Sequence, residues 1–338
     1  AEDGIRDYKV TGVQTCALPI LNLLDTNPYL LCFNNGVVDF KNKTHRKGQP
    51  DDYISKCTNI DFTPLDQIKD QQTINEINQF IDQLFPIVDL REYMWQHMAS
   101  CLIGTNENQT FNIYTGSGCN GKSKLVDLLG KALGNYKATV PTTLITQTRN
   151  SIGSTSSEVV QLVGTRLVVM SEPSKGEKIN EGIMKEITGG DPIQGRALFK
   201  EASTFIPQFN LVVQTNTLFD IKSNDDGTWR RIRVCDFMSK FHDNPYNELD
   251  KFPKENYPYQ FKIDKKIDEK FVIWAPIFAS MLVKIAYETQ GHVKDCKIVM
   301  SESDKYREGQ DYLAEFAKDR IQRKNDAKIK KKIGRAHV

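Results

Sequence analysis

The chain has 338 residues, of which 39% are hydrophobic and 26% charged, a composition typical of a soluble globular protein. No run of 18 apolar residues occurs, so no membrane-spanning helix is expected. Lys and Arg (45) nearly balance Asp and Glu (43), so a nucleic-acid contact would have to come from a local patch. The 7 cysteines form no C-x-x-C pair, which argues against a disulfide framework or zinc site and favours a reducing compartment.

Both ends of the chain resemble translated sequencing adapter. Residues 1–20 (AEDGIRDYKVTGVQTCALPI) show no periodicity, no helix cap and no apolar core of a signal peptide. Residues 332–338 (KIGRAHV) resemble the reverse complement of the same adapter's inner end. We therefore expect residues 21–331 to be the interpretable protein, a fragment of a longer reading frame. A native, disordered N-terminus is the alternative.

Residues 21–104 predict a small α+β collar domain. Turn signals at Asn27-Pro28 and Asn34-Asn35-Gly36 border the apolar runs 29–33 and 37–40, a pattern typical of a β-hairpin. Apolar residues at helical spacing predict an amphipathic helix that ends at Pro86. They predict a second helix over residues 90–103, closed by Gly104.

The strongest functional pattern opens the next domain, residues 105–240. Residues 116–123 read G-x-x-x-x-G-K-S, between a strand-like run (111–114) and apolar residues at helical spacing. A P-loop requires this strand–loop–helix setting, in which backbone N–H groups and the helix N-terminus bind phosphate. We expect ATP to bind Gly116, Ser117, Gly118, Cys119, Asn120, Gly121, Lys122 and Ser123, with Lys122 on the β- and γ-phosphates and Ser123 on Mg²⁺.

Helical and strand patterns alternate over residues 109–237, which favours an α/β fold with a mainly parallel sheet. The expected strands are 166–170, 209–214 and 232–237. Glu172 follows the first strand at the sheet edge where ligands bind, so we expect it to polarise the attacking water and to contribute to the Mg²⁺ site. Ser171 stands where many P-loop proteins carry another acid. Asn216 follows the second strand and is expected to sense the γ-phosphate or orient the water.

Two further segments carry chemistry-bearing side chains. Residues 185–190 predict a helix with a Gly-Gly stop, followed by two strands joined by a tight turn at 199–201. The tip residues Phe199 and Lys200 would offer a ring to stack on a base and a cation for a phosphate of DNA. Phe-Lys pairs are common, so an ordinary hairpin tip is the alternative.

Residues 229–233 (WRRIR) follow an Asp-Asp-Gly turn, and their strand-like pattern would put Arg231 and Arg233 on one face and Arg230 on the other. Arg230 or Arg231 could act as an arginine finger on the ATP of a neighbouring subunit. A surface strand with solvated arginines is the alternative.

The rest of the chain is less specific. Residues 240–260 are polar and rich in Asn, Pro and Tyr, which predicts a linker. Helices are expected over 269–289 and 303–319. The charge run at 324–331 is expected to be a solvated tail.

The order of these motifs resembles the superfamily 3 helicases, in particular the primase–helicases of large DNA viruses, virophages and phages. The resemblance rests on the Asn120-Gly121-Lys122-Ser123 form of the P-loop, the K-x-x-T-G-G-D block at 185–191, and the QTN (214–216) and WRR (229–231) segments. Residues 34–39 (NNGVVD) resemble the signature of the family's helicase-associated N-terminal domain, and residues 300–312 resemble its post-helicase segment.

The resemblance implies an AAA+-like core, a homo-hexameric ring and translocation on single-stranded DNA with unwinding of the duplex. It implies that Glu172 is the catalytic carboxylate, Asn216 the sensor, Arg230 or Arg231 the finger, and that the hairpin near Lys200 faces the channel. Family members carry a primase domain upstream, and a polymerase is a further expected partner. The place of action would be the cytoplasm of an infected host cell or of a bacterium.

Two other classes of function stay open at the level of sequence. One is a different P-loop enzyme, either a DNA-packaging ATPase or a phosphotransferase. DNA would not stimulate the hydrolysis of ATP by a phosphotransferase. The other is a non-catalytic DNA-binding replication adaptor, which DNA-stimulated ATP hydrolysis would exclude.

Overall fold

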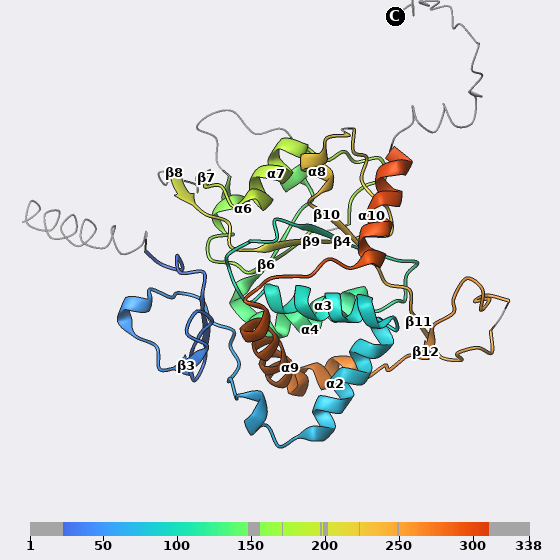
Figure 1. Ribbon diagram of the computed structural model, residues 1–338, viewed down its shortest axis with the longest axis horizontal. Coiled ribbons are helices and arrows are strands. Elements are labelled where there is room, and N and C mark those ends of the chain that lie inside the picture. The colour runs from blue at the N-terminus through green and yellow to red at the C-terminus, as the bar shows by residue number, and fades with distance from the viewer. Residues whose placement is uncertain are drawn as a thin grey trace, which may run out of the picture.

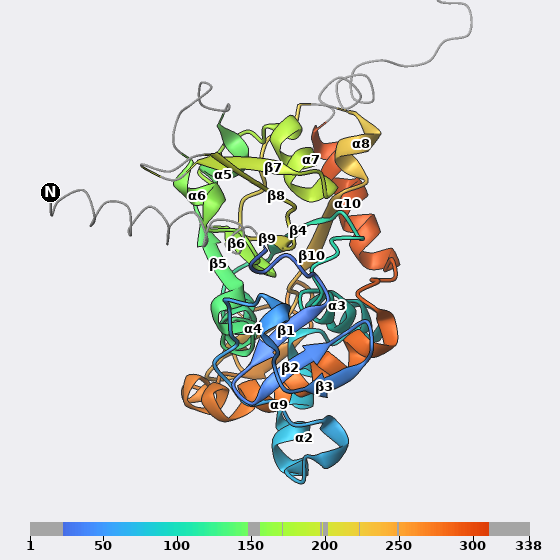
Figure 2. The ribbon, with the colours of Figure 1, turned by 90° about the vertical axis from the view of Figure 1, so that its left-hand side faces the viewer.

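A computed structural model describes residues 23–147, 156–170, 172–196, 198, 202–222, 224–248 and 250–310. A five-stranded sheet crosses the middle of the molecule, with helices on both faces (Figure 1). A separate three-stranded sheet, formed by the first described segment, lies beside the helices of one face (Figure 2).

The N-terminal sheet is an antiparallel meander of β1 (Leu30–Phe33), β2 (Gly36–Asp39) and β3 (Thr44–Arg46). The expected hairpin is confirmed, with Phe33 opposite Gly36. The Asn35 side chain accepts from the Phe62 amide and donates to its carbonyl, so the turn is tied to the chain that leaves the sheet. Two short 3₁₀ turns follow, η1 (Pro50–Asp52) and η2 (Leu65–Gln67).

Three helices share an apolar core with this sheet. Helix α2 (Gln71–Leu84) begins at Asp70, whose carboxylate caps the Thr73 amide, and α3 (Val88–Ser100) follows after Pro86. Helix α9 (Ile267–Thr289) returns from far along the chain and packs against α2 and α3. By length and composition α9 is apolar enough to cross a membrane, and more than half of its most apolar stretch is buried inside the protein.

The central sheet has the strand order β10-β4-β9-β6-β5, and every neighbouring pair is parallel. Numbered by chain order within the sheet, that is 5-1-4-3-2. Its strands are β4 (Phe111–Thr115), β5 (Lys137–Val140), β6 (Leu167–Met170), β9 (Asn210–Gln214) and β10 (Ile232–Asp236). The expected mixed α/β fold with a mainly parallel sheet is confirmed. Parallel pairing places all five carboxyl ends at one edge, where polar residues that follow the strands can meet.

Helices cover both faces of the sheet. Helix α4 (Lys122–Leu133), which η3 (Gly134–Tyr136) continues, shares one face with α3 and α9, and the core of that face extends into the N-terminal sheet. The other face is covered by short and medium helices: α5 (Thr143–Thr146), α6 (Ser157–Val160), α7 (Glu181–Gly189), α8 (Asp226–Trp229) and α10 (Lys297–Gln310). One apolar core therefore joins the N-terminal sheet, the central sheet and α9.

A buried arginine fixes the N-terminal segment at the amino end of the sheet. Arg166 precedes β6 and donates to the carbonyls of Asn27 and Leu30, at 3.3 and 3.2 Å, and to the Gln208 side chain. Gln208 precedes β9 and donates in turn to the carbonyls of Asp25 and Thr26. The guanidinium also lies over the Tyr136 ring. Burial lowers the pKa of Arg166 to about 10.

Two expectations for the second half of the chain are wrong. The supposed linker contains a parallel ladder of β11 (Lys240–His242) and β12 (Gln260–Lys262), because the buried Gln260 side chain organises the intervening chain. The strand-like alternation of residues 229–233 does not hold for Arg230 and Arg231, because Asp225 caps a helical turn that Arg230 closes. The expected strand itself begins at Ile232, as β10. The two strands around residue 200, β7 (Ile193–Arg196) and β8 (Ala202–Phe205), do form a hairpin.

Candidate functional site: the phosphate loop and its neighbours

The loop of residues 116–121 connects the end of β4 to the start of α4, at the carboxyl edge of the sheet. Gly121 is the N-cap of α4, and Lys122 and Ser123 are its first two residues. The first turn of this helix therefore presents free backbone N–H groups and the positive end of the helix dipole to the loop. The strand–loop–helix setting that a P-loop requires is present.

Two glycines in the loop cannot be replaced without rearrangement. Gly116 has φ +149°, and a Cβ there would lie 2.1 Å from the Asn120 amide nitrogen. Gly121 has φ +84°, and its Cβ would lie 2.2 Å from a methyl group of Leu84 at the end of α2. The loop is thus bent back on itself and packed against the N-terminal region, which only glycine permits at these positions.

Three side chains singled out from the sequence meet at this edge. The Lys122 ammonium is buried and donates to the Gly116 carbonyl at 3.1 Å and to Asn216 Oδ1 at 2.8 Å. The Asn216 backbone amide donates to Glu172 Oε1 at 3.1 Å. Lys122, Asn216 and Glu172 come from α4 and from the ends of β9 and β6, so the parallel sheet brings together residues up to 94 positions apart.

Local turns hold the two residues that follow the strands. The Thr215 hydroxyl accepts from the Thr217 amide at 2.8 Å and donates to the Thr217 carbonyl, which fixes the turn that presents Asn216. Asn216 and Glu172 are both exposed, whereas the strands they follow are buried. Their polar ends therefore face solvent beside a buried ammonium group.

The electrostatics of Lys122 are those of a cation without a full set of partners. Burial lowers the pKa of Lys122, and the charge of Lys240 lowers it further, while Glu172 and Asp236 oppose the shift. Nearby, the Asn120 side chain is buried and its Nδ2 donor has no hydrogen-bond partner. A buried donor without an acceptor is costly. A phosphate oxygen would satisfy both Asn120 and Lys122, so the loop fits a nucleotide.

A divalent cation would have few protein ligands here. Ser123 is exposed on the first turn of α4, and the Glu172 carboxylate accepts from the Asn216 amide. Within the described part of the chain no three His, Cys, Asp or Glu residues gather as a metal cluster. Mg²⁺ in P-loop sites keeps several waters and takes phosphate oxygens as ligands. The residues present fit that mode of binding.

Two residues of this edge were missed from the sequence. Asp236 ends β10 opposite Thr115, directly before the loop, and burial raises its pKa. Lys240 is buried, and its ammonium donates to the Gly118 carbonyl at 2.9 Å. The position of Asp236 at the end of an expected strand was a usable signal. Lys240 lay in the segment interpreted as a linker.

Arg230 and Arg231 lie at the other end of β4. The Phe111 amide, first in β4, donates to the Arg231 carbonyl, whereas the phosphate loop follows the last residue of that strand. Five residues of strand put roughly 15 Å between the two ends. Neither arginine therefore belongs to the phosphate loop of its own chain.

The two arginines differ in their surroundings. Arg230 is exposed and donates to the Gln109 side chain at 3.1 Å. Arg231 is largely buried; its Nη1 donates to the Gly227 carbonyl at 2.6 Å, and its Nε lacks a partner. Burial, and then the charge of Arg230, lower the pKa of Arg231. Gln109 also donates to the Gly189 carbonyl, so the Arg pair adjoins the Gly-Gly end of α7.

Three residues discussed in the sequence analysis lie outside the described residues. They are Phe199 and Lys200, expected at the tip of the β7–β8 hairpin, and Ser171, which precedes Glu172. Leu198, the one tip residue described, is exposed. The DNA-contact role of the tip therefore stays a prediction.

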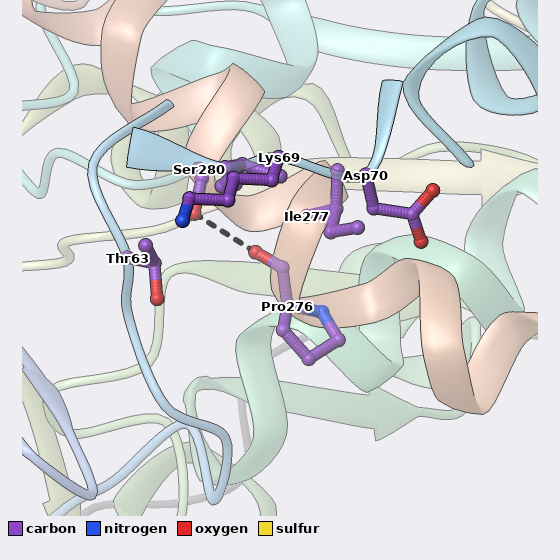
Figure 3. A pocket seen from close by; sticks show the side chains of 7 residues that line it. Thr63, Lys69, Asp70, Pro276, Ile277 and Ser280 are labelled. Atoms are coloured by element: carbon purple, nitrogen blue, oxygen red, sulfur yellow. Dashed lines mark hydrogen bonds between the residues drawn. The ribbon is translucent and has the colours of Figure 1, made fainter. Parts of the chain in front are cut away.

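A pocket elsewhere does not take part in this site. It has a volume of about 250 Å³ and lies between the start of α2 and the middle of α9 (Figure 3). Its lining includes Asp70, which caps α2, and Pro276, whose carbonyl accepts from the Ser280 hydroxyl at 3.0 Å. The phosphate loop meets the opposite end of α2, about 20 Å away along a helix of 14 residues.

Comparison with known proteins finds relatives that match most of the chain. The family described as D5 N terminal like matches residues 10–86, starting inside the stretch that resembles adapter, and a family of unknown function (DUF5906) matches residues 114–231. A protein of Acanthamoeba polyphaga mimivirus that is named a helicase is 39% identical over 311 residues, covering 91% of this chain and 32% of its own length. An African swine fever virus protein named a primase is 27% identical over 311 residues, covering 89% and 32%.

The solved apo structure of the NrS-1 C-terminal region has a similar fold. Its TM-score is 0.52 at 18% sequence identity, over 77% of this chain and 57% of that one. The family match at the N-terminal region and the relatives named helicase and primase define the class to which the chain is similar. The chain belongs to the viral primase–helicase family. It spans about a third of the length of the curated relatives it matches.

Proposed function

We propose that the chain is the motor part of an ATP-dependent DNA helicase of viral or phage type, with an AAA+-like P-loop core of superfamily 3. The observation that carries this proposal is the meeting of Lys122, Asn216 and Glu172 beside a phosphate loop with an unsatisfied Asn120 donor. The 5-1-4-3-2 strand order supports it, because the strand that precedes Asn216 lies between the phosphate-loop strand and the strand that precedes Glu172.

In this proposal each residue has a defined part in ATP hydrolysis. The loop amides and the α4 N-terminus bind the phosphates, and Lys122 exchanges Asn216 Oδ1 for a phosphate oxygen. Asn216, released from Lys122, then orients the attacking water, and Glu172 accepts its proton. Ser123 and Glu172, with phosphate oxygens and waters, hold Mg²⁺, which would neutralise charge on the phosphates.

A second chain would complete the site. Arg230 and Arg231 lie too far along β4 to reach their own phosphate loop, and an arginine finger supplied by a neighbour fits that position. We propose that the neighbour is another copy in a homo-hexameric ring. The β7–β8 hairpin, with Phe199 and Lys200 at its tip, would then contact single-stranded DNA in the channel.

The relatives support a proposal for the setting of this activity. The relatives are named helicase and primase and come from viruses, which supports a role in viral DNA replication in an infected host cell. The chain would act there as part of a longer protein, with a primase domain or a polymerase as a partner. A bacterial cytoplasm is the setting if the source is a phage. A DNA-packaging ATPase, a phosphotransferase and a non-catalytic adaptor are the competing proposals.

The first test measures ATP hydrolysis with and without single-stranded DNA, and unwinding of a forked duplex. The Lys122→Ala variant should lose hydrolysis by more than ~100-fold, because the phosphates lose their main cation. The matched control is Lys124→Ala: Lys124 lies two residues away but is half-exposed and paired with Asp268 at 2.8 Å. The control should retain hydrolysis. Equal rates for both variants would contradict the site assignment.

A mixing experiment tests the neighbour's part. The Arg230→Ala/Arg231→Ala variant should bind ATP but not hydrolyse it. Mixed with Lys122→Ala, which still carries both arginines, it should regain hydrolysis in mixed rings, since each inactive chain supplies what the other lacks. Activity that mixing does not restore would place the arginines outside the reaction, while the Lys122 result would still stand.

A further inference from the structure

The apex of the phosphate loop is held by hydrogen bonds from a segment far along the chain. Gly118 has φ +81°, and among the described residues no heavy atom beyond its chain neighbours lies within 4 Å of where its Cβ would be. Instead Lys240 Nζ donates to the Gly118 carbonyl at 2.9 Å, and the Phe241 amide donates to the Cys119 carbonyl at 2.8 Å. Both donors belong to β11.

The ammonium of Lys240 is buried without an anionic partner. The residue is 7% exposed, and among the described residues it forms no ion pair with a carboxylate. Its ammonium faces the Phe252 and Tyr257 rings, with 5.0 and 5.5 Å to the ring centroids. Cation–π contacts offset only part of the cost of removing an ammonium from water.

The segment that buries Lys240 is itself built to hold those rings. The Gln260 side chain donates to the carbonyls of Phe252 and Tyr257, both at 3.0 Å, and accepts from the Tyr246 amide at 2.9 Å. This segment, residues 243–248 and 250–259, extends away from the body of the molecule at the right of Figure 1 and is anchored at the β11–β12 ladder. The hydrogen bonds of the buried Gln260 side chain therefore position the two rings that contact Lys240 beside the phosphate loop.

Two buried lysines close to one loop repel each other unless an anion lies between or beside them. Burial lowers the pKa of Lys122; Glu172 and Asp236 oppose this shift, and the charge of Lys240 adds to it. A nucleotide polyphosphate would relieve this repulsion. By polarising the Gly118 carbonyl, the Lys240 ammonium would also strengthen the donor on the same peptide group, the Cys119 N–H.

We propose that Lys240 is a positioning residue of the nucleotide site: it fixes the Gly118 peptide and adds positive charge to the phosphate loop, so that affinity for ATP depends on it. This inference deepens the proposed function and depends on it. It assigns a role to the β11–β12 segment, which the pattern of the sequence marks only as a linker.

The test compares two substitutions that separate charge from packing. Lys240→Met keeps an unbranched apolar stem against Phe252 and Tyr257 but removes the charge and the hydrogen bond. Lys240→Arg keeps a cation. The dissociation constant of Mg-ATP, measured by displacement of a fluorescent ATP analogue, should rise about 10-fold for Lys240→Met and less than 3-fold for Lys240→Arg. The loss for AMP should be smaller than for ATP, since fewer charges face the loop.

The controls keep the two proposals apart. Lys265→Met removes the same charge from an exposed lysine paired with Asp243, and should bind ATP as the wild type does. If the wild type does not bind ATP at all, the proposed function fails. If the wild type binds ATP and Lys122→Ala does not, but Lys240→Met binds as tightly as the wild type, only the role of Lys240 is overturned. Melting temperatures without nucleotide identify a variant that has merely unfolded, and Lys240→Arg then decides the result.

Discussion

Arg166 and Lys122 are buried cations at opposite edges of the same parallel sheet, and their surroundings differ in kind. Arg166 donates to the Gln208 side chain and to the carbonyls of Gly164, Asn27 and Leu30, and three segments of the chain meet around it. Lys122 donates to one carbonyl and to Asn216, an exposed amide. The guanidinium serves the fold, whereas the ammonium has a partner that a ligand can displace. Burial of a charge alone therefore does not mark a functional site.

The largest effect is expected when Arg166 is removed. Arg166→Met removes the donor to the Gln208 side chain and to the carbonyls of Gly164, Asn27 and Leu30, and each buried group left unsatisfied costs ~1–3 kcal/mol. Because the groups can relax, we expect a total loss of ~4 kcal/mol in the free energy of unfolding. Urea unfolding of the wild type and the variant measures it. A loss below ~1 kcal/mol would show that the arginine is not a structural link between the N-terminal segment and the sheet.

The next effect tests the proposed site at the carboxyl edge of the same sheet. Glu172→Gln keeps the shape of the side chain and an oxygen that can accept from the Asn216 amide, but it removes the base. ATP hydrolysis should fall ~100- to 1,000-fold with little change in ATP affinity, because general-base catalysis contributes in that range. Single-turnover hydrolysis and nucleotide binding, measured on the same preparation, separate the two quantities. A variant that hydrolyses ATP normally would assign the proton to another group, with Asp236 as the next candidate.

The two edges also differ in how far the sequence predicts them. The phosphate loop, Glu172 and Asn216 were predictable because each follows a short apolar run, and in a parallel sheet the ends of such runs meet. Arg166 was counted as part of a strand, although its role depends on contacts with Asn27 and Leu30, about 140 positions earlier. Local pattern carries no information on such contacts.

Lys240 and the arginine pair show the same limit in other forms. The composition of residues 240–260 is that of a loop, and only the fold shows that Gln260 gathers it around Lys240. The strand-like pattern through Arg230 and Arg231 is wrong, although the strand expected from Ile232 forms, because the Asp225 side chain accepts from the Thr228 amide and caps a helical turn. An Asp at the start of a helical turn is a signal that the sequence contains, but the alternating arginines after it also fit a strand.

The smallest effect is expected for the free energy of unfolding, measured without ATP, when the charge of Lys122 is removed. Lys122→Met should change the free energy of unfolding by less than ~1 kcal/mol, because the lost hydrogen bonds are offset by relief from burying the charge. Burial lowers the pKa of Lys122 in the folded state below the 10.5 of the free side chain. Between those two values the unfolded chain binds more protons, so the stability of the wild type gains on that of Lys122→Met as the pH rises toward 10.5. Urea unfolding of both proteins at pH 7.5 and at a pH near 10 measures the difference. A loss for Lys122→Met as large as that for Arg166→Met would mean that both cations are structural, and the contrast between the two edges of the sheet would disappear.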